Sequence, residues 1–325
     1  MTVFLIRRLM QAVVVLFVMS LIVFIGVYAI GNPIDILISP EADQAERERA
    51  IAALGLDRPM WEQYLTFLAK AVQGDLGRSF AFSTPALQLI VERMPATLEL
   101  AIVAMFMSIA LGIPLGMWAG FRPESRAGKA IMAGSILGFS LPTFWVGLML
   151  IMVFAVYLGW LPSTGRGETV TVLGLRISIL TWDGILHILM PAFNLALFKM
   201  ALVIRLTRAG MRETLQLDYV KFARAKGLSS RRVIFVHVMK NIMIPVVTIL
   251  GLELGSVIAF AVVTETIFAW PGMGKLIIDS INQLDRPVIV AYLLVTVSMF
   301  IFINLVVDIL YSVLDPRVRL KEMKA

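Results

Sequence analysis

Long apolar runs, separated by shorter polar and charged stretches, dominate the sequence and predict membrane-spanning helices. A helix needs about 20 mostly apolar residues to cross the hydrocarbon core of a bilayer. The short segments of alternating hydrophobicity that a transmembrane barrel requires are not evident. We therefore expect an all-α, polytopic membrane protein with about six spans, near residues 9–30, 96–120, 130–158, 186–206, 242–268 and 288–312.

The segment 31–95, between the first two predicted spans, is too polar to cross a membrane. It contains a plausible short helix near 43–53 and an amphipathic helix near 59–72. We expect a small, ordered extracytoplasmic extension, so that residues 1–325 form a single transmembrane domain. The first apolar run has spanning length and no clear small-residue cleavage site, so we interpret it as a retained helix rather than a signal peptide.

Composition agrees with a membrane protein and argues against catalysis. The chain is 59% hydrophobic and 16% charged, whereas a soluble domain is about 45–50% apolar and about 25% charged. Cysteine is absent, and His187 and His237 are too few for a histidine metal cluster. There is no Gly-x-x-x-x-Gly-Lys-[Ser/Thr] loop for ATP phosphates, and Ser140 has no histidine near it in sequence. We expect no cofactor and no catalytic site on this chain.

Basic residues cluster in alternate connections and so predict the orientation. The net charge of +7 indicates cytoplasmic loops rather than nucleic-acid binding, because Lys and Arg accumulate on the cytoplasmic side of membrane proteins. Both termini are then cytoplasmic. The basic clusters are Arg7 and Arg8; Arg122, Arg126 and Lys129; the lysines and arginines of 207–241; and Arg317, Arg319, Lys321 and Lys324.

The connection 207–241 is the most informative of these loops. Helix connections in bundles usually have about two to eight residues, so a basic segment of this length indicates a function. A short helix is expected at 217–226 with Gly227 as its C-terminal cap. Ser229 or Ser230 can cap a second helix that follows.

The surface of this loop is open to two interpretations. Ala223, Ala225 and Gly227 are small, so the backbone of the loop would be accessible to the surface of another protein. The alternative is a solvated basic loop that binds anionic lipid headgroups.

Seven recognisable segments follow one another along nearly the whole chain: 74–79 (Gly-Asp-Leu-Gly-Arg-Ser), 95–100, 138–145, 218–228, 264–274, 304–311 and 315–319. Together and in this order they resemble the dipeptide/oligopeptide permease branch of binding-protein-dependent ABC importers. Residues 221–223 (Lys-Phe-Ala) depart from the wider importer family, which has Glu-Ala-Ala followed by Gly.

The resemblance implies a type I ABC importer permease fold and half of a translocation pathway for di- or oligopeptides. The implied partners are a second homologous permease subunit, two ATP-binding subunits that hold ATP and Mg²⁺, an extracytoplasmic solute-binding protein, the peptide substrate and membrane lipid. The implied location is a bacterial or archaeal cytoplasmic membrane.

Three groups of site residues follow from the resemblance together with the position of polar residues in the spans. The coupling residues for an ATPase subunit are Tyr219, Ala223, Arg224, Ala225, Lys226, Gly227 and Leu228. Candidates for docking of the binding protein are Asp75, Gly77, Arg78, Trp270 and Gly272. Candidates for the translocation path or a gate are Ser140, Pro142, Lys199, Glu253, Glu265, Asn304 and Asp308.

Each group has a purely structural alternative. Residues 74–79 and 270–274 can be plain turns, with Trp270 as an interfacial anchor, and Asp308 can tie helices together. An unpaired charge at mid-membrane costs about 2.5–3.5 kcal/mol. Lys199 and Glu253 therefore either pair as a static brace or face a wet cavity, where Gly251 and Gly255 would leave room beside Glu253.

Two other functions fit the sequence. The same architecture can carry another solute, such as a nickel chelate, glutathione or an oligosaccharide. A self-sufficient secondary transporter is the second alternative, but the inverted internal repeats expected of one are not visible.

The orientation is testable because the chain has no cysteine. Single cysteines at Ala45 and Val170 should react with a membrane-impermeant maleimide applied to intact cells. Cysteines at Ser125 and Ala225 should react only after the cells are opened. Labelling of position 225 from outside would contradict the predicted orientation and with it the coupling assignment.

Overall fold

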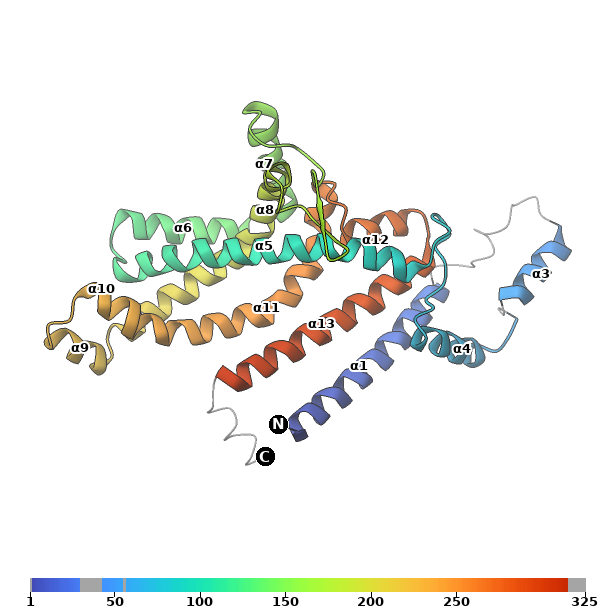
Figure 1. The fold of residues 1–325 in the computed structure, drawn as a ribbon, viewed down its shortest axis with the longest axis horizontal. Helices are drawn as coiled ribbons and strands as arrows, with labels where there is room; N and C mark the ends of the chain where they lie inside the picture. The colour runs from blue at the N-terminus through green and yellow to red at the C-terminus, as the bar shows by residue number, and fades with distance from the viewer. Residues whose placement is uncertain (1, 30–42, 55–56, 315–325) are drawn as a thin grey trace. The chain divides into compact units, whose positions relative to one another are not determined.

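A computed structural model describes residues 2–29, 43–54 and 57–314, and these are mostly helical (Figure 1). The chain divides into two compact units. One contains residues 1–94 and 272–305, and the other contains residues 95–271 and 306–325. Two long helices, α5 (Ala86–Phe121) and α13 (Arg286–Leu314), contribute to both units.

The first unit contains the beginnings of α5 and α13 together with four other described helices. Helix α4 packs on α1 through an aromatic cluster in which the Tyr64 ring lies 5.2 Å from the Phe24 ring. The Tyr64 hydroxyl also lies 2.9 Å from Ser20 Oγ. The four helices are α1 (Thr2–Ala29), α3 (Gln44–Leu54), α4 (Met60–Val72) and α12 (Met273–Asn282). The two short helices predicted between the first spans therefore form, as α3 and α4.

The second unit is organised around α8 (Trp182–Thr214), which contacts α6, α7 and α11. Asp183 lies in the first turn of α8 and Thr181 caps it through a hydrogen bond from Gly184 N. The other elements are α6 (Arg126–Ser140), α7 (Thr143–Leu150), the π-helix η1 (Ile151–Tyr157), β1 (Val170–Val172), β2 (Leu175–Ile177), α9 (Asp218–Ala225), α10 (Ser230–Arg232), the π-helix η2 (Val233–Val238) and α11 (Met239–Ile267).

Three glycines spaced four residues apart bring α5 close to α8. A Cβ atom on Gly116 would lie 2.7 Å from the Ile204 carbonyl oxygen. One on Gly112 would lie 2.8 Å from Val203, and one on Gly120 would lie 2.6 Å from Met211. Small residues at such spacing let helix backbones approach within a membrane, where dispersion and polar contacts drive association.

The third predicted span, 130–158, is wrong as a single straight helix. Helix α6 ends at Ser140, and the pair α6 and α7–η1 is bent by 109°. The cause is Pro142, because a proline forces the preceding residue out of the helical region. Leu141 accordingly has φ −78° and ψ 135°. Among the residues that the structure describes, five helices are long and apolar enough to span a membrane, or six when the bent pair counts as one span.

Two helix boundaries and one hairpin also differ from the sequence-based expectation. Helix α5 begins at Ala86, ahead of the predicted span, and contains Pro95. Helix α8 continues to Thr214, so the first part of the segment 207–241 is helical rather than a loop. The hairpin β1–β2 was not predicted; its two-residue turn has positive φ at Leu173 and Gly174, the geometry that suits the twist of a hairpin.

The close approach of α5 to α8 predicts opposite effects for two glycine substitutions. Gly116→Ala should destabilise the protein by about 1–3 kcal/mol, because overpacking forces the backbones apart. Gly134→Ala on α6 is the matched control, since nothing lies within 4 Å of a Cβ there. It should be neutral or slightly stabilising, because alanine is the better helix former. Thermal unfolding in detergent measures both; equal midpoints would contradict the close packing of α5 on α8.

Candidate functional site

Helix α9 and its cap form as the sequence predicted. Gly227 has φ +76°, a conformation that glycine adopts without strain. The amide of Leu228 donates to the Ala223 carbonyl at 3.3 Å, which satisfies a carbonyl at the end of the helix. Ser229 caps the next helix, because its Oγ accepts a hydrogen bond from Arg232 N at 3.4 Å.

One face of α9 is held by the protein and the other is open. Val220 and Ala223 are buried. The Tyr219 hydroxyl donates to the His237 carbonyl at 3.2 Å and accepts from the Asn241 side chain at 2.8 Å. Burial raises the pKa of Tyr219, so the hydroxyl keeps its proton. Tyr219 therefore ties α9 to η2 and to the start of α11.

The open face is basic and contains small residues. Arg224, Ala225, Lys226 and Gly227 are exposed, and nothing lies within 4 Å of a Cβ placed on Gly227. The Lys226 ammonium sits 4.6 Å from the centre of the Phe222 ring. Of the coupling residues predicted from sequence, these form one accessible surface, whereas Ala223 is part of the packing beneath it.

The acidic residue at the start of α9 is also accounted for. Lys221 Nζ donates to Asp218 Oδ1 at 2.9 Å, and this hydrogen bond lowers the pKa of Asp218. Both side chains are well exposed, so the pair orders the helix start and contributes little free energy.

The segment 74–79 is a turn fastened to the connection between α12 and α13. Gly74 and Gly77 have φ +82° and +87°, and Asp75 Oδ1 accepts from Gly77 N at 3.0 Å. Ser79 Oγ donates to Asp285, which also accepts from Phe80 N at 3.1 Å. Asp75 and Arg78 are both exposed. The geometry accounts for the motif as a turn and leaves its charged tip accessible.

Trp270 is not an interfacial anchor. Its side chain is fully buried, and its indole N–H donates to the Ala96 carbonyl at 2.9 Å. Gly272 is buried as well. Neither residue offers a surface to a docking protein in this chain, because an indole with its N–H satisfied inside the fold is a packing residue.

A buried polar cluster lies at the start of the spanning part of α5. Glu99 accepts hydrogen bonds from the Arg166 guanidinium at 2.5 and 3.1 Å and from Ser178 N and Ile179 N at 2.7 and 2.9 Å. The connection between η1 and α8 is thereby fastened to α5. Sequence reasoning missed this pair, although a carboxylate inside a predicted span already indicates a hidden partner.

Glu265 belongs to the same region and is also fully buried. Its carboxylate accepts from Thr97 Oγ1 at 2.6 Å, and its backbone carbonyl accepts from Trp270 N at 2.8 Å. As a path or gate candidate, Glu265 is therefore inside the packing of this chain rather than on a surface.

Lys199 and Glu253 form an ion pair. Ser256 Oγ lies 2.7 Å from both Lys199 Nζ and Glu253 Oε2. Gly251 does not leave room beside them, since a Cβ there would lie 2.7 Å from Val307. The pairing fits the brace interpretation, yet the Glu253 side chain is 31% exposed, so the pair also reaches a surface.

The remaining path candidates lie on other elements of the chain. Ser140 and Pro142 are exposed at the bend between α6 and α7, and Asn304 and Asp308 are half-buried on α13.

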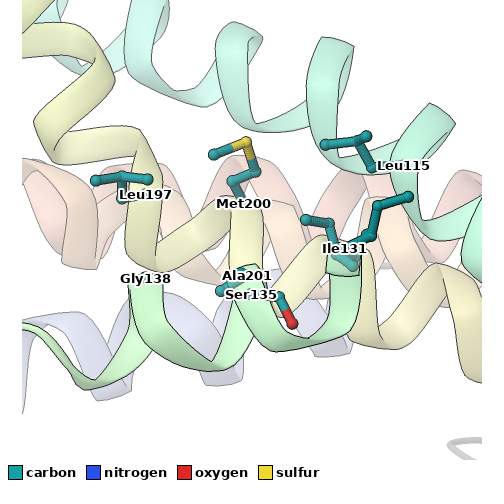
Figure 2. Close-up of a pocket in the computed structure, with 9 residues that line it drawn as sticks. Leu115, Ile131, Ser135, Gly138, Leu197, Met200 and Ala201 are labelled. Atoms are coloured by element: carbon teal, nitrogen blue, oxygen red, sulfur yellow. The ribbon is translucent and has the colours of Figure 1, made fainter. Parts of the chain in front are cut away.

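A cavity of about 180 Å³ lies between α5, α6 and α8 (Figure 2). Its lining includes Leu115, Ile131, Leu197 and Met200 and is almost entirely apolar. The Ser135 hydroxyl also lines it and donates to the Met132 carbonyl, so the cavity has little to offer a polar peptide backbone and no carboxylate or imidazole ligand for a metal ion. In the part of the chain that the structure describes, no group of three His, Asp or Glu side chains is placed to hold a metal.

Known proteins agree with this architecture along nearly the whole chain. The model of the binding-protein-dependent transport system inner membrane component matches residues 112–320, and that of the corresponding N-terminal component matches residues 1–101. A chain of the MetNI methionine ABC transporter, in an inward-facing crystal structure, superposes with a TM-score of 0.52 at 14% identity. That superposition covers 70% of this chain and 97% of the other, and it shows the fold alone.

Two curated relatives are similar over nearly their full lengths. The oligopeptide transport system permease protein AppB of Bacillus subtilis (strain 168) is 40% identical over 320 residues, which cover 98% of this chain and 99% of the relative. The dipeptide transport system permease protein DppB of Escherichia coli (strain K12) is 38% identical over 336 residues, with the same coverage. The resemblance read from the motifs is confirmed, and the chain belongs to the family of binding-protein-dependent transport system inner membrane components, the membrane permease subunits of ABC importers.

Proposed function

We propose that this chain forms one half of a translocation pathway for di- or oligopeptides. The curated relatives described above are named for these substrates. The other half is a second homologous permease subunit, two ATP-binding subunits dock on the cytoplasmic side, and a solute-binding protein delivers the peptide from outside. Both termini are cytoplasmic.

The observation that carries the coupling role is the open face of α9. Arg224, Ala225, Lys226 and Gly227 are small or basic and exposed at the end of α9, so an ATP-binding subunit can approach the backbone closely there. The departure at residues 221–223 places Lys221 where the wider family has an acid, and this lysine is already paired with Asp218. Contact with the ATPase then depends on the exposed residues 224–227.

Motion of α9 would be transmitted to the spanning helices through direct hydrogen bonds. Tyr219 joins α9 to His237 of η2 and to Asn241 of α11, and α11 packs along α8. Closure of the ATP-binding subunits would pull on α9 and tilt α11 and α8 together, a rigid-body transition of packed helices. ATP and Mg²⁺ bind the partner subunits and this chain binds no cofactor, so its role is mechanical rather than catalytic.

On the outer side, Asp75 and Arg78 are the accessible candidates for contact with the binding protein. The turn that bears them is fastened to Asp285, so a docked protein would act on the start of α13. Gly77 serves the turn through its positive φ.

Substitutions at Gly227 can distinguish a loss of contact with a partner from a loss of folding of this chain. Gly227→Trp should abolish ATP-dependent peptide uptake while the protein remains in the membrane, because the indole would block the groove. Within this chain nothing lies within 4 Å of a Cβ at this position, and the positive φ costs a non-glycine residue about 1–2 kcal/mol. Gly227→Asn is the matched control, since asparagine tolerates positive φ. It should retain at least about half of the uptake. Normal uptake by a well-expressed Gly227→Trp variant would refute the coupling role.

A further inference from the structure

Two phenylalanines and two basic residues form a continuous series of contacts along α6 and α8, which we call the cation–aromatic strip. The rings of Phe139 and Phe198 stack with their centroids 4.6 Å apart. The Arg205 guanidinium lies 4.6 Å from the centre of the Phe139 ring, and Lys199 Nζ lies 5.1 Å from that of Phe198. Through Lys199 the strip continues to Glu253 of α11.

The strip is open at the level of the spans. Phe139 is 43% exposed and Phe198 is 38% exposed, and Arg205 is half-buried. Charged side chains inside spanning helices face the bundle interior, water or a protein partner, because contact with lipid tails is costly. A partly exposed carboxylate at Glu253 beside these cations therefore indicates a surface turned away from the hydrocarbon.

The charges on the strip are not balanced within the described residues. Lys199 is neutralised by Glu253. No carboxylate lies within ion-pair distance of Arg205 in the part of the chain that the structure describes, and the ring of Phe139 is what faces its guanidinium there. One positive charge is thus available to an anion. The side-chain hydrogen bonds of Glu253 to Lys199 and Ser256 use Oε2, so with respect to the residues that the structure describes Oε1 is available to a cation.

We propose that the cation–aromatic strip is a contact site for the peptide during translocation, an inference that rests on the function proposed above. Arg205 pairs with the C-terminal carboxylate, Glu253 accepts from the N-terminal ammonium, and the rings of Phe139 and Phe198 contact the side chains between them. Glu253 is paired with Lys199, so position 199 marks where the carboxylate lies along α8. Positions 199 and 205 are separated by about 9 Å along the helix axis. An extended peptide of about three residues spans this distance.

The test compares a tripeptide with its C-terminal amide in the complete importer, reconstituted in vesicles with its partner subunits and binding protein. Both peptides are first shown to load onto the binding protein, and the ratio of variant to wild-type uptake then cancels any difference in delivery. Arg205→Gln should reduce uptake of the free acid about tenfold and that of the amide less than about twofold, since a hydrogen-bonded charge pair is lost only for the acid. Arg205→Lys keeps the positive charge and should therefore restore most of the wild-type preference for the free acid over the amide.

The matched control is Arg122→Gln. The Arg122 guanidinium lies 5.4 Å from the Trp118 ring at the end of α5, so this variant loses the same kind of arginine–aromatic contact and should change the uptake of neither peptide. Equal losses of acid and amide in Arg205→Gln, or no loss of either, would overturn the proposal.

Three further outcomes distinguish another role for Arg205, failure of the peptide function itself and failure of the strip alone. A loss that varies with the anionic lipid content of the vesicles, and is the same for acid and amide, would assign Arg205 to a lipid phosphate and overturn the proposal. Wild-type vesicles that import neither peptide would overturn both this inference and the peptide function. If wild-type vesicles import the peptides, and Arg205→Gln leaves the ratio of free-acid to amide uptake unchanged, the role of the strip would be overturned while the peptide function would stand.

Discussion

The close contact between α5 and α8 is the constraint on which the arrangement of the second unit depends. Gly112, Gly116 and Gly120 place the α5 backbone against Val203, Ile204 and Met211 with no space for a methyl group. In a membrane the hydrophobic effect does not drive helices together, so close backbone packing and polar contacts must do so. Helix α8 is then in position to contact α6, α7 and α11 and to carry Lys199 toward Glu253.

Polar groups in the spans follow from the same constraint. Each one needs a partner, because hydrocarbon provides none. Glu99 is matched by Arg166 and two backbone amides, Glu265 by Thr97, and Asn194 by Thr264 at 3.1 Å. Arg205 differs, because a ring rather than a carboxylate faces it among the described residues. A site for substrate is most readily built where such a charge is left uncompensated.

The sequence predicts local features of this chain well and distant pairings poorly. Apolar runs of spanning length and the helix at α9 with Gly227 as its cap follow from hydropathy and from backbone preferences of single residues, and both are confirmed. The break at Pro142 was visible as a proline in a predicted span. Its bend of 109° was not, because prolines such as Pro95 and Pro191 lie inside continuous helices.

In the candidate site, too, the sequence predicts local features better than contacts between distant residues. Trp270 resembles an interfacial anchor in sequence, and only the fold reveals the Ala96 carbonyl that satisfies its indole N–H. The partners of Glu99 and Ser79 are 67 and 206 residues away along the chain, so no spacing rule connects them. For Lys199 and Glu253 the sequence left open whether they pair or face a wet cavity, and only the fold shows that they pair and that Glu253 is partly exposed.

The proposed function depends most on contact between the open face of α9 and an ATP-binding subunit. The most direct measurement introduces a photoreactive benzoylphenylalanine at Ala225 in the assembled importer and identifies the cross-linked product by mass spectrometry. The same residue placed at Ile136 of α6, which is 55% exposed, provides the control. We predict a cross-link from position 225 to the ATP-binding subunit and none to that subunit from position 136. Cross-links from position 225 to lipid alone, in an importer that retains its ATP-binding subunits, would contradict contact between α9 and an ATP-binding subunit.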